Sequence, residues 1–195
     1  MRESLLGKYH MLTYRTYFSI GCALHGKGDL EEALIALRRA MRITTVKKDK
    51  AKIQGGKDYI CWVLKKDGKD DKEIASYQEQ LEKSIAHELK GDRYADDWKH
   101  KKALREYKKA LDLESAAAGT GHVDVADLYA KIADVLVLNG DDPIDYYIKA
   151  LKIYTEAFGE NHPYYMSTME KMNPAKASKL KAKILARKSK PSELS

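Results

Sequence analysis

Three short stretches of the chain share the pattern Gly-x-x-His, whose imidazole could do chemistry. They are LLGKYH at residues 5–10, GTGHVD at 119–124 and FGENHP at 158–163. Histidine can serve as a general base or a metal ligand. No histidine here lies in an HExxH motif or four residues from a second histidine, so the sequence predicts no metal site. A glycine that closes a helix in the left-handed conformation would place His122 and His162 where the next helix begins, which predicts a structural role for both.

Carboxylate pairs are the other groups that could carry catalysis or hold a cation. They are Asp70-Asp71, Asp96-Asp97 and Asp141-Asp142, and we expect each at the start of a helix, where carboxylates complement the helix dipole. The chain contains neither a GxSxG motif nor a Walker phosphate loop. The sequence therefore predicts a protein that is not an enzyme and uses no cofactor.

The composition favours an all-helical, soluble protein. Of the 195 residues, 44% are hydrophobic and 33% are charged, with only 12 glycines and 4 prolines. No apolar run reaches the length of a membrane helix and no signal peptide is recognisable, so we expect an intracellular and most simply cytoplasmic location. Cys22 and Cys61 do not form a CxxC motif, and we interpret them as small, packed residues.

The formal charge of +7 is concentrated at the C-terminal end. Residues 1–170 carry 28 basic and 28 acidic side chains, whereas residues 171–195 carry eight basic and one acidic. A neutral body argues against a nucleic-acid groove across the main domain. We predict a repeat domain at residues 1–170, followed at residues 171–195 by a basic capping helix and tail.

Internal repeats organise the rest of the chain. The segments ALIALRRAMRITTV (residues 33–46), ALREYKKALDLESAAAG (103–119) and DYYIKALKIYTEAFG (145–159) align with one another. A helix with a small residue at its centre and a Gly-Asp turn precedes the first and the last. The unit is therefore loop, helix, turn, helix, in which small residues let antiparallel helices approach closely.

Two kinds of residue define this unit: small residues within the helices, and the glycine and histidine of each joint, the Gly-x-x-His loop between two units. They are Gly21, Ala33, Ala40, Ala103, Ala110, Gly119, His122, Ala133, Ala150, Gly159 and His162. The pattern resembles the tetratricopeptide repeat, and its Gly-x-x-His loop resembles the longer repeats of kinesin light chains. The resemblance implies a right-handed α-solenoid of antiparallel helix pairs, whose first helices line a concave face that holds peptides or proteins.

The middle of the chain departs from this pattern. The loop at residues 47–58 lacks Gly-x-x-His, and the interval between Leu89 and Ala103 is too short for a helix and a turn. We expect one long or bent helix over residues 96–118. Asn173-Pro174 is typical of a helix start and marks the expected capping helix.

Candidate partner-binding residues follow from the resemblance, because positions one turn from each small residue would face the concave side. They are Arg15, Phe18, Asp58, Trp62, Lys65, Lys66, Ala130, Asp134 and Val137. Trp62 beside two lysines is the strongest single candidate for an anchor, although a core position fits this tryptophan equally well. The lysine and asparagine arrangement that clamps the carboxylate of chaperone tails is not reproduced.

Lysine clusters give a second candidate surface. Its residues are Lys47, Lys48, Lys50, Lys52, Lys99, Lys101, Lys102, Lys179, Lys183 and Arg187. These side chains fit solvated helix faces, and they also fit a basic strip against RNA or an acidic protein. The main expectation is a non-catalytic scaffold that holds a protein or peptide partner, within a larger assembly or alone, and the alternative is a module associated with RNA or ribonucleoprotein.

Overall fold

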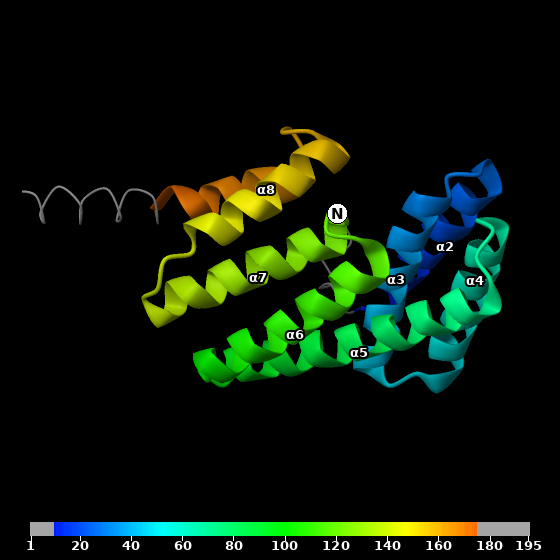
Figure 1. The fold of residues 1–195 in the computed structure, drawn as a ribbon, viewed down its shortest axis with the longest axis horizontal. Helices are drawn as coiled ribbons and strands as arrows, with labels where there is room; N and C mark the ends of the chain where they lie inside the picture. Colours follow the sequence, from blue (N-terminus) through cyan, green and yellow to red (C-terminus); the bar gives the residue numbers. More distant parts are fainter. Residues whose placement is uncertain (1–9, 175–195) are drawn as a thin grey trace, which may run out of the picture. The chain divides into compact units, whose positions relative to one another are not determined.

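The computed structural model describes residues 10–174, and it confirms the predicted all-helical fold. The helices are α2 (Met11–Lys27), α3 (Leu30–Lys47), α4 (Lys50–Lys66), α5 (Asp71–Asp96), α6 (His100–Ala118), α7 (Val123–Asn139) and α8 (Ile144–Phe158) (Figure 1). Residues 163–174 are also helical. No helix within the described residues combines the length and the apolar character that crossing a membrane requires.

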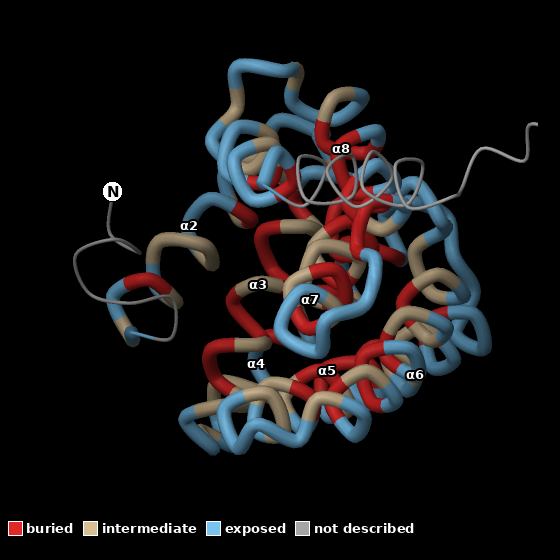
Figure 2. The backbone as a smooth tube through the Cα atoms, turned by 90° about the vertical axis from the view of Figure 1, so that its left-hand side faces the viewer, coloured by how far each residue is buried: buried red, intermediate tan, exposed pale blue. Residues whose placement is uncertain are grey.

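The chain divides into two compact units at Leu89 and Lys90. In the first unit, α3 packs against both α2 and α4. Its core contains Leu37 and Met41 of α3, Ile60 of α4, and Leu81 and Ile85 of α5. Buried stretches run along α3, whereas α2 is mostly half-buried or exposed (Figure 2). One face of α2 is therefore available to solvent or to a partner.

Glycine at position 21 allows α2 and α3 to approach each other. A Cβ atom at Gly21 would lie 2.7 Å from Leu37 Cγ and 3.2 Å from the carbonyl oxygen of Ala33. Both distances are shorter than ordinary van der Waals contact, so only glycine fits without a shift of the Leu37 side chain or of α3. This close approach is the reason that the predicted unit has a small residue at the centre of its first helix.

The prediction of one long or bent helix over residues 96–118 is correct for residues 100–118, which form α6, but its start is wrong. The long helix is α5, which has 26 residues and ends at Asp96, and α6 begins at His100 after a tight turn. Residues 90–96 of α5 belong to the second unit, where Tyr94 and Ala95 pack against Ala103 and Tyr107 of α6. The missing helix of the third pair is thus the continuation of α5, which explains why so few residues separate Leu89 from Ala103.

In the second unit, α7 packs against α6 and α8. Figure 1 shows α7 and α8 running side by side. Leu128 and Ile132 of α7 join the core formed with α6, and Met172 packs with Tyr147 of α8. Asn173 and Pro174 continue the helix that begins at residue 163, so the predicted helix start at Asn173 is wrong. The rest of the predicted capping helix lies outside the described residues.

The histidines of the Gly-x-x-His stretches have the same hydrogen bond in all three places. In each, the backbone N–H two residues later donates to the histidine Nδ1, at 3.1 Å for His10, 3.2 Å for His122 and 3.3 Å for His162. Each imidazole therefore satisfies one of the N–H groups that the first turn of a helix leaves without a partner.

The glycines before two of these histidines have a positive φ. The sequence predicted the left-handed helical conformation for them, and the structure differs in ψ. Gly119 has φ 86° and ψ 158°, and Gly159 has φ 79° and ψ 168°. This backbone region is open essentially to glycine alone. The pattern keeps glycine because the chain leaves the helix in an extended direction before the histidine caps the next helix.

The acidic pairs differ in their positions. Asp70 starts α5 by accepting the N–H of Glu73 at 2.8 Å, while Glu73 accepts the N–H of Asp70 at 3.0 Å. This reciprocal pair is a capping box. Asp142 accepts the N–H of Ile144 at the start of α8. The expectation is wrong for Asp96, which ends a helix.

Candidate protein-binding surface

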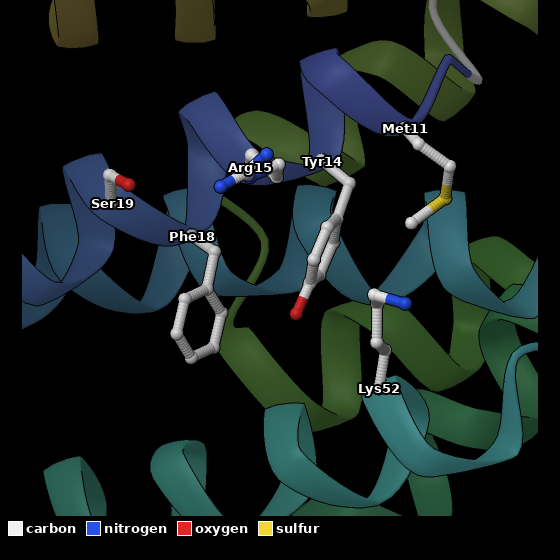
Figure 3. Close-up of a pocket in the computed structure, with 6 residues that line it drawn as sticks. All are labelled: Met11, Tyr14, Arg15, Phe18, Ser19 and Lys52. Carbon is white, nitrogen blue, oxygen red and sulfur yellow. The ribbon is translucent and has the colours of Figure 1, made fainter.

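A pocket of about 500 Å³ lies between α2 and α4 in the first unit. Figure 3 shows Tyr14 and Phe18 extending from α2 toward the helix that carries Lys52. The lining residues are Met11, Tyr14, Arg15, Phe18, Ser19 and Lys52. We refer to this pocket together with the adjoining aromatic residues of α2 and α4 as the α2/α4 surface.

A row of aromatic rings continues from the pocket along the α2/α4 surface. The ring of Phe18 lies 5.8 Å from Tyr14 and 5.6 Å from Tyr59, centroid to centroid. Tyr59 lies 5.3 Å from Trp62, and His25 of α2 lies 4.0 Å from Trp62. These separations are typical of interacting rings. Because Trp62 is 46% exposed, the row ends in an indole that a partner can contact.

Cationic groups border the aromatic row. Arg15 is exposed at the pocket and makes no ion pair among the residues described here. Lys52 pairs with Asp49 at 2.5 Å, and this hydrogen bond lowers the pKa of the Asp49 carboxyl. Lys65 pairs with Asp71 at 2.9 Å, which raises the pKa of Lys65.

The tyrosines of the surface remain neutral hydrogen-bond donors at ordinary pH. Burial and a hydrogen bond to Cys22 raise the pKa of Tyr59 to about 12. Burial also raises the pKa of Tyr14. Both rings therefore present an apolar body and a polar tip, as aromatic residues at interfaces commonly do.

The structure places some of the predicted partner-binding residues together and not others. Arg15 and Phe18 line the pocket, and Trp62 lies in the aromatic row. Lys66 is exposed at the end of α4. Asp58 is also exposed and accepts a 2.8 Å hydrogen bond from Gln54 of its own helix.

The predicted residues of α7 belong to the second unit. Val137 is 47% exposed and Ala130 is half-buried. Asp134 accepts a hydrogen bond from Tyr147 and pairs with Lys171. Both of its carboxylate oxygens are thus engaged within the chain.

The lysine clusters fall on three helices. Lys47 ends α3, Lys48 occupies the turn with φ 56°, and Lys50 begins α4. Lys99, Lys101 and Lys102 lie at the start of α6. The predicted residues Lys179, Lys183 and Arg187 lie outside the described residues.

The residues predicted to define the repeat lie at helix contacts and joints. Gly21 and the alanines have little or no exposed surface: Ala33, Ala40, Ala103, Ala110, Ala133 and Ala150. Gly119 and Gly159 end helices, and His122 and His162 cap the helices that follow.

Sequence reasoning missed three members of the aromatic row: Tyr14, His25 and Tyr59. A signal was present, because Met11, Tyr14 and Phe18 follow i, i+3, i+7 spacing and share one face of α2. The predicted residues of α2 lie close to Gly21, whereas the pocket extends to Tyr14 and Met11 near the start of the helix.

Glu114, His122 and Asp124 form the one group in the described part of the chain with three clustered metal-ligand side chains. Their donor atoms lie within 4.8 Å of one another, and all three residues are buried. His122 Nδ1 already accepts the N–H of Asp124 as a helix cap. We assign this group to the structure of the joint between α6 and α7.

Comparison with known families identifies one repeat. Residues 139–164 match a tetratricopeptide repeat. The matched segment contains the turn after α7, all of α8, Gly159 and the capping His162. A tetratricopeptide repeat supports a helical scaffold for protein interactions, which is typically not catalytic. A search of curated proteins gave no match to the chain.

Proposed function

We propose that this chain is a non-catalytic scaffold that holds a segment of another protein on the α2/α4 surface. The observation that carries the proposal is the pocket of about 500 Å³ continued by an aromatic row that ends at the exposed Trp62. Tetratricopeptide repeats use the face of their first helices for such contacts, and α2 and α4 occupy those positions here. Aromatic and arginine side chains dominate the binding energy of protein interfaces.

The chemistry of the surface favours a partner segment with an apolar side chain next to a carboxylate. Phe18 and Tyr14 offer apolar area, and the exposed guanidinium of Arg15 stands beside them. A carboxylate paired with arginine gains a charge-assisted hydrogen bond, which is stronger than a neutral one. The partner is most simply a neighbouring subunit in a larger assembly inside the cell.

The joints support a narrower relationship to the kinesin-light-chain type of repeat. Three separate helices begin with a histidine cap in the setting Gly-x-x-His. We propose that this longer joint, and not only the helix pair, defines the repeat in this chain.

Site-specific photocrosslinking in the native cell tests the proposed surface. A crosslinking residue replaces Ser19 in the pocket or, as a matched control, Ser76 on the exposed side of α5. We expect an adduct with one partner protein from position 19 and little from position 76. Equal adducts at both positions, or none at position 19, would overturn the proposal.

A further inference from the structure

The turn between α5 and α6 presents the most exposed large hydrophobic side chain in the described part of the chain. Trp98 is 77% exposed. Its ring lies 6.0 Å from the imidazole of His100, at an interplanar angle of 33°. Since no core contact accounts for this position, packing does not explain a tryptophan here.

The backbone of Trp98 is also unusual. Trp98 has φ 58°, a left-handed value that is strained for any residue with a Cβ atom. Its N–H bonds to Ala95 O at 3.0 Å, and the next N–H bonds to Tyr94 O at 2.8 Å. The same pair of bonds closes the helices before Gly28, Gly68 and Gly140, where glycine has a positive φ without strain.

The exposed side of α6 next to this turn is strongly basic. The exposed cationic residues at its start and middle are Lys101, Lys102, Arg105, Lys108 and Lys109. Lys101, Arg105 and Lys108 follow helical spacing, so they form one row along the helix. Asp97 pairs with Lys99 at 2.8 Å, and the carboxylate of Glu106 pairs with Arg105 at 3.6 Å and with Lys109 at 3.3 Å. The cations of this face still outnumber its carboxylates, so it is net positive.

This combination differs from an ordinary protein interface. Trp98 is the only exposed large apolar side chain between residues 97 and 112, where the structure describes every residue. The core of a protein interface gathers several apolar side chains and few charges. A single aromatic plane beside a row of cations is instead the arrangement that binds single-stranded nucleic acid, where a base stacks on the ring and phosphates meet lysine or arginine.

We propose that the α5–α6 turn and the basic row of α6 form a site for single-stranded RNA, separate from the α2/α4 surface. An unpaired base stacks on the indole of Trp98, and the backbone phosphates follow Lys101, Arg105 and Lys108. The left-handed turn displays the indole, and its strain is retained because the exposed ring is needed for binding.

Replacing Trp98 with glycine separates this function from folding. Glycine suits the turn, so Trp98→Gly should unfold at the same or a higher denaturant concentration than the wild type. The same variant should bind a fluorescein-labelled twelve-nucleotide oligouridylate about tenfold or more weakly at low salt, because stacking of a base accounts for such a factor. Unchanged affinity in Trp98→Gly would overturn the proposal.

Charge reversal tests the phosphate contacts. The double variant Lys101→Glu/Lys108→Glu should lower the affinity at least tenfold and make the slope of log affinity against log salt shallower by about 1.4, or 0.7 for each lost phosphate contact. The control Lys69→Glu/Lys72→Glu makes the same change of charge on exposed residues of the first unit, and it should change the affinity less than about twofold. Equal losses in the two double variants would contradict a local site.

Fluorescence of Trp98 reports stacking directly. In Trp62→Phe, Trp98 is the sole tryptophan of the full chain. Oligouridylate should quench its emission, and an acidic twelve-residue glutamate peptide should neither quench it nor displace the oligonucleotide. Displacement by the peptide would show that the surface serves an acidic protein and would overturn the RNA site.

Discussion

The hydroxyl of Tyr147 donates a 2.8 Å hydrogen bond to Asp134 Oδ1, while Lys171 Nζ lies 2.7 Å from the other oxygen of the same carboxylate. The arrangement joins α8 and the helix at residues 163–174 to one aspartate of α7. A second aspartate, Asp92, accepts Tyr107 Oη at 2.8 Å and Lys131 Nζ at 2.5 Å. In both cases the tyrosine comes from the next helix and the lysine from the helix after that. Each of the two aspartates therefore fixes the register of three successive helices.

Removing Asp134 should therefore cost more than removing the Tyr147 hydroxyl. Tyr147→Phe loses one hydrogen bond to a carboxylate, at about 1.5–2 kcal/mol of unfolding free energy. Asp134→Ala also leaves the buried Tyr147 hydroxyl without its acceptor, so we expect a loss of about 3 kcal/mol. Lys171→Met should cost less than about 1 kcal/mol, because that ion pair is partly exposed. Urea unfolding measures all three, and the reverse order would contradict the account of this contact.

The same tyrosine should make the fold sensitive to alkaline pH. Burial and the hydrogen bond to Asp134 raise the pKa of Tyr147 well above its ordinary value of 10.0. Above pH 10 the unfolded chain loses this proton while the folded chain keeps it, so the folded state binds more protons and its stability falls as the pH rises. The free energy of unfolding should fall less between pH 9 and 11 in Tyr147→Phe than in the wild type. Parallel curves would show that Tyr147 does not contribute.

Two glycines of α2 should respond oppositely to the same substitution. Gly21→Ala places a Cβ atom 2.7 Å from Leu37, so overpacking of about 1–3 kcal/mol should outweigh the gain in helix propensity. Gly26→Ala meets no atom within 4 Å and should raise stability by up to about 1 kcal/mol. Thermal unfolding of the two variants gives the sign directly. A stabilising Gly21→Ala would mean that α2 and α3 do not approach so closely.

The histidine caps should be replaceable by another capping residue. His162→Ala removes the acceptor of the Tyr164 N–H and should cost about 1 kcal/mol of unfolding free energy. His162→Asn restores an acceptor and should recover part of that loss, although it gives up the stacking of His162 on Phe158 at 4.3 Å. Chemical denaturation measures the unfolding free energy of both variants. If His162→Asn loses as much stability as His162→Ala, the role of His162 is stacking alone.

The repeat at both ends of the chain could be predicted from sequence because its small residues and joints are spaced by local geometry. Gly21 is required by a contact with α3, and the Gly-x-x-His joints by a helix exit and a cap. The middle could not be predicted, because the interval between Leu89 and Ala103 is too short for a separate helix and is occupied by the continuation of α5. Its role in a third pair depends on contacts between Asp92 and Tyr107 that no local pattern specifies.

The candidate surface was predicted only in part for a related reason. The position of Phe18 followed from helical spacing, but its contact with Tyr59 depends on how α2 and α4 are held by α3. Trp62 fitted a core or a surface position equally well from sequence. In the structure the Trp62 side chain is exposed, and its ring lies against the imidazole of His25.

The affinity of the partner segment for variants of the α2/α4 surface tests the central claim most directly. The measurement is isothermal titration of the peptide identified by crosslinking at position 19. Phe18→Ala and Arg15→Glu should each weaken its binding tenfold or more, whereas Lys152→Glu on the exposed side of α8 should change it less than about twofold. Equal affinity for the wild type and both surface variants would contradict a binding site between α2 and α4.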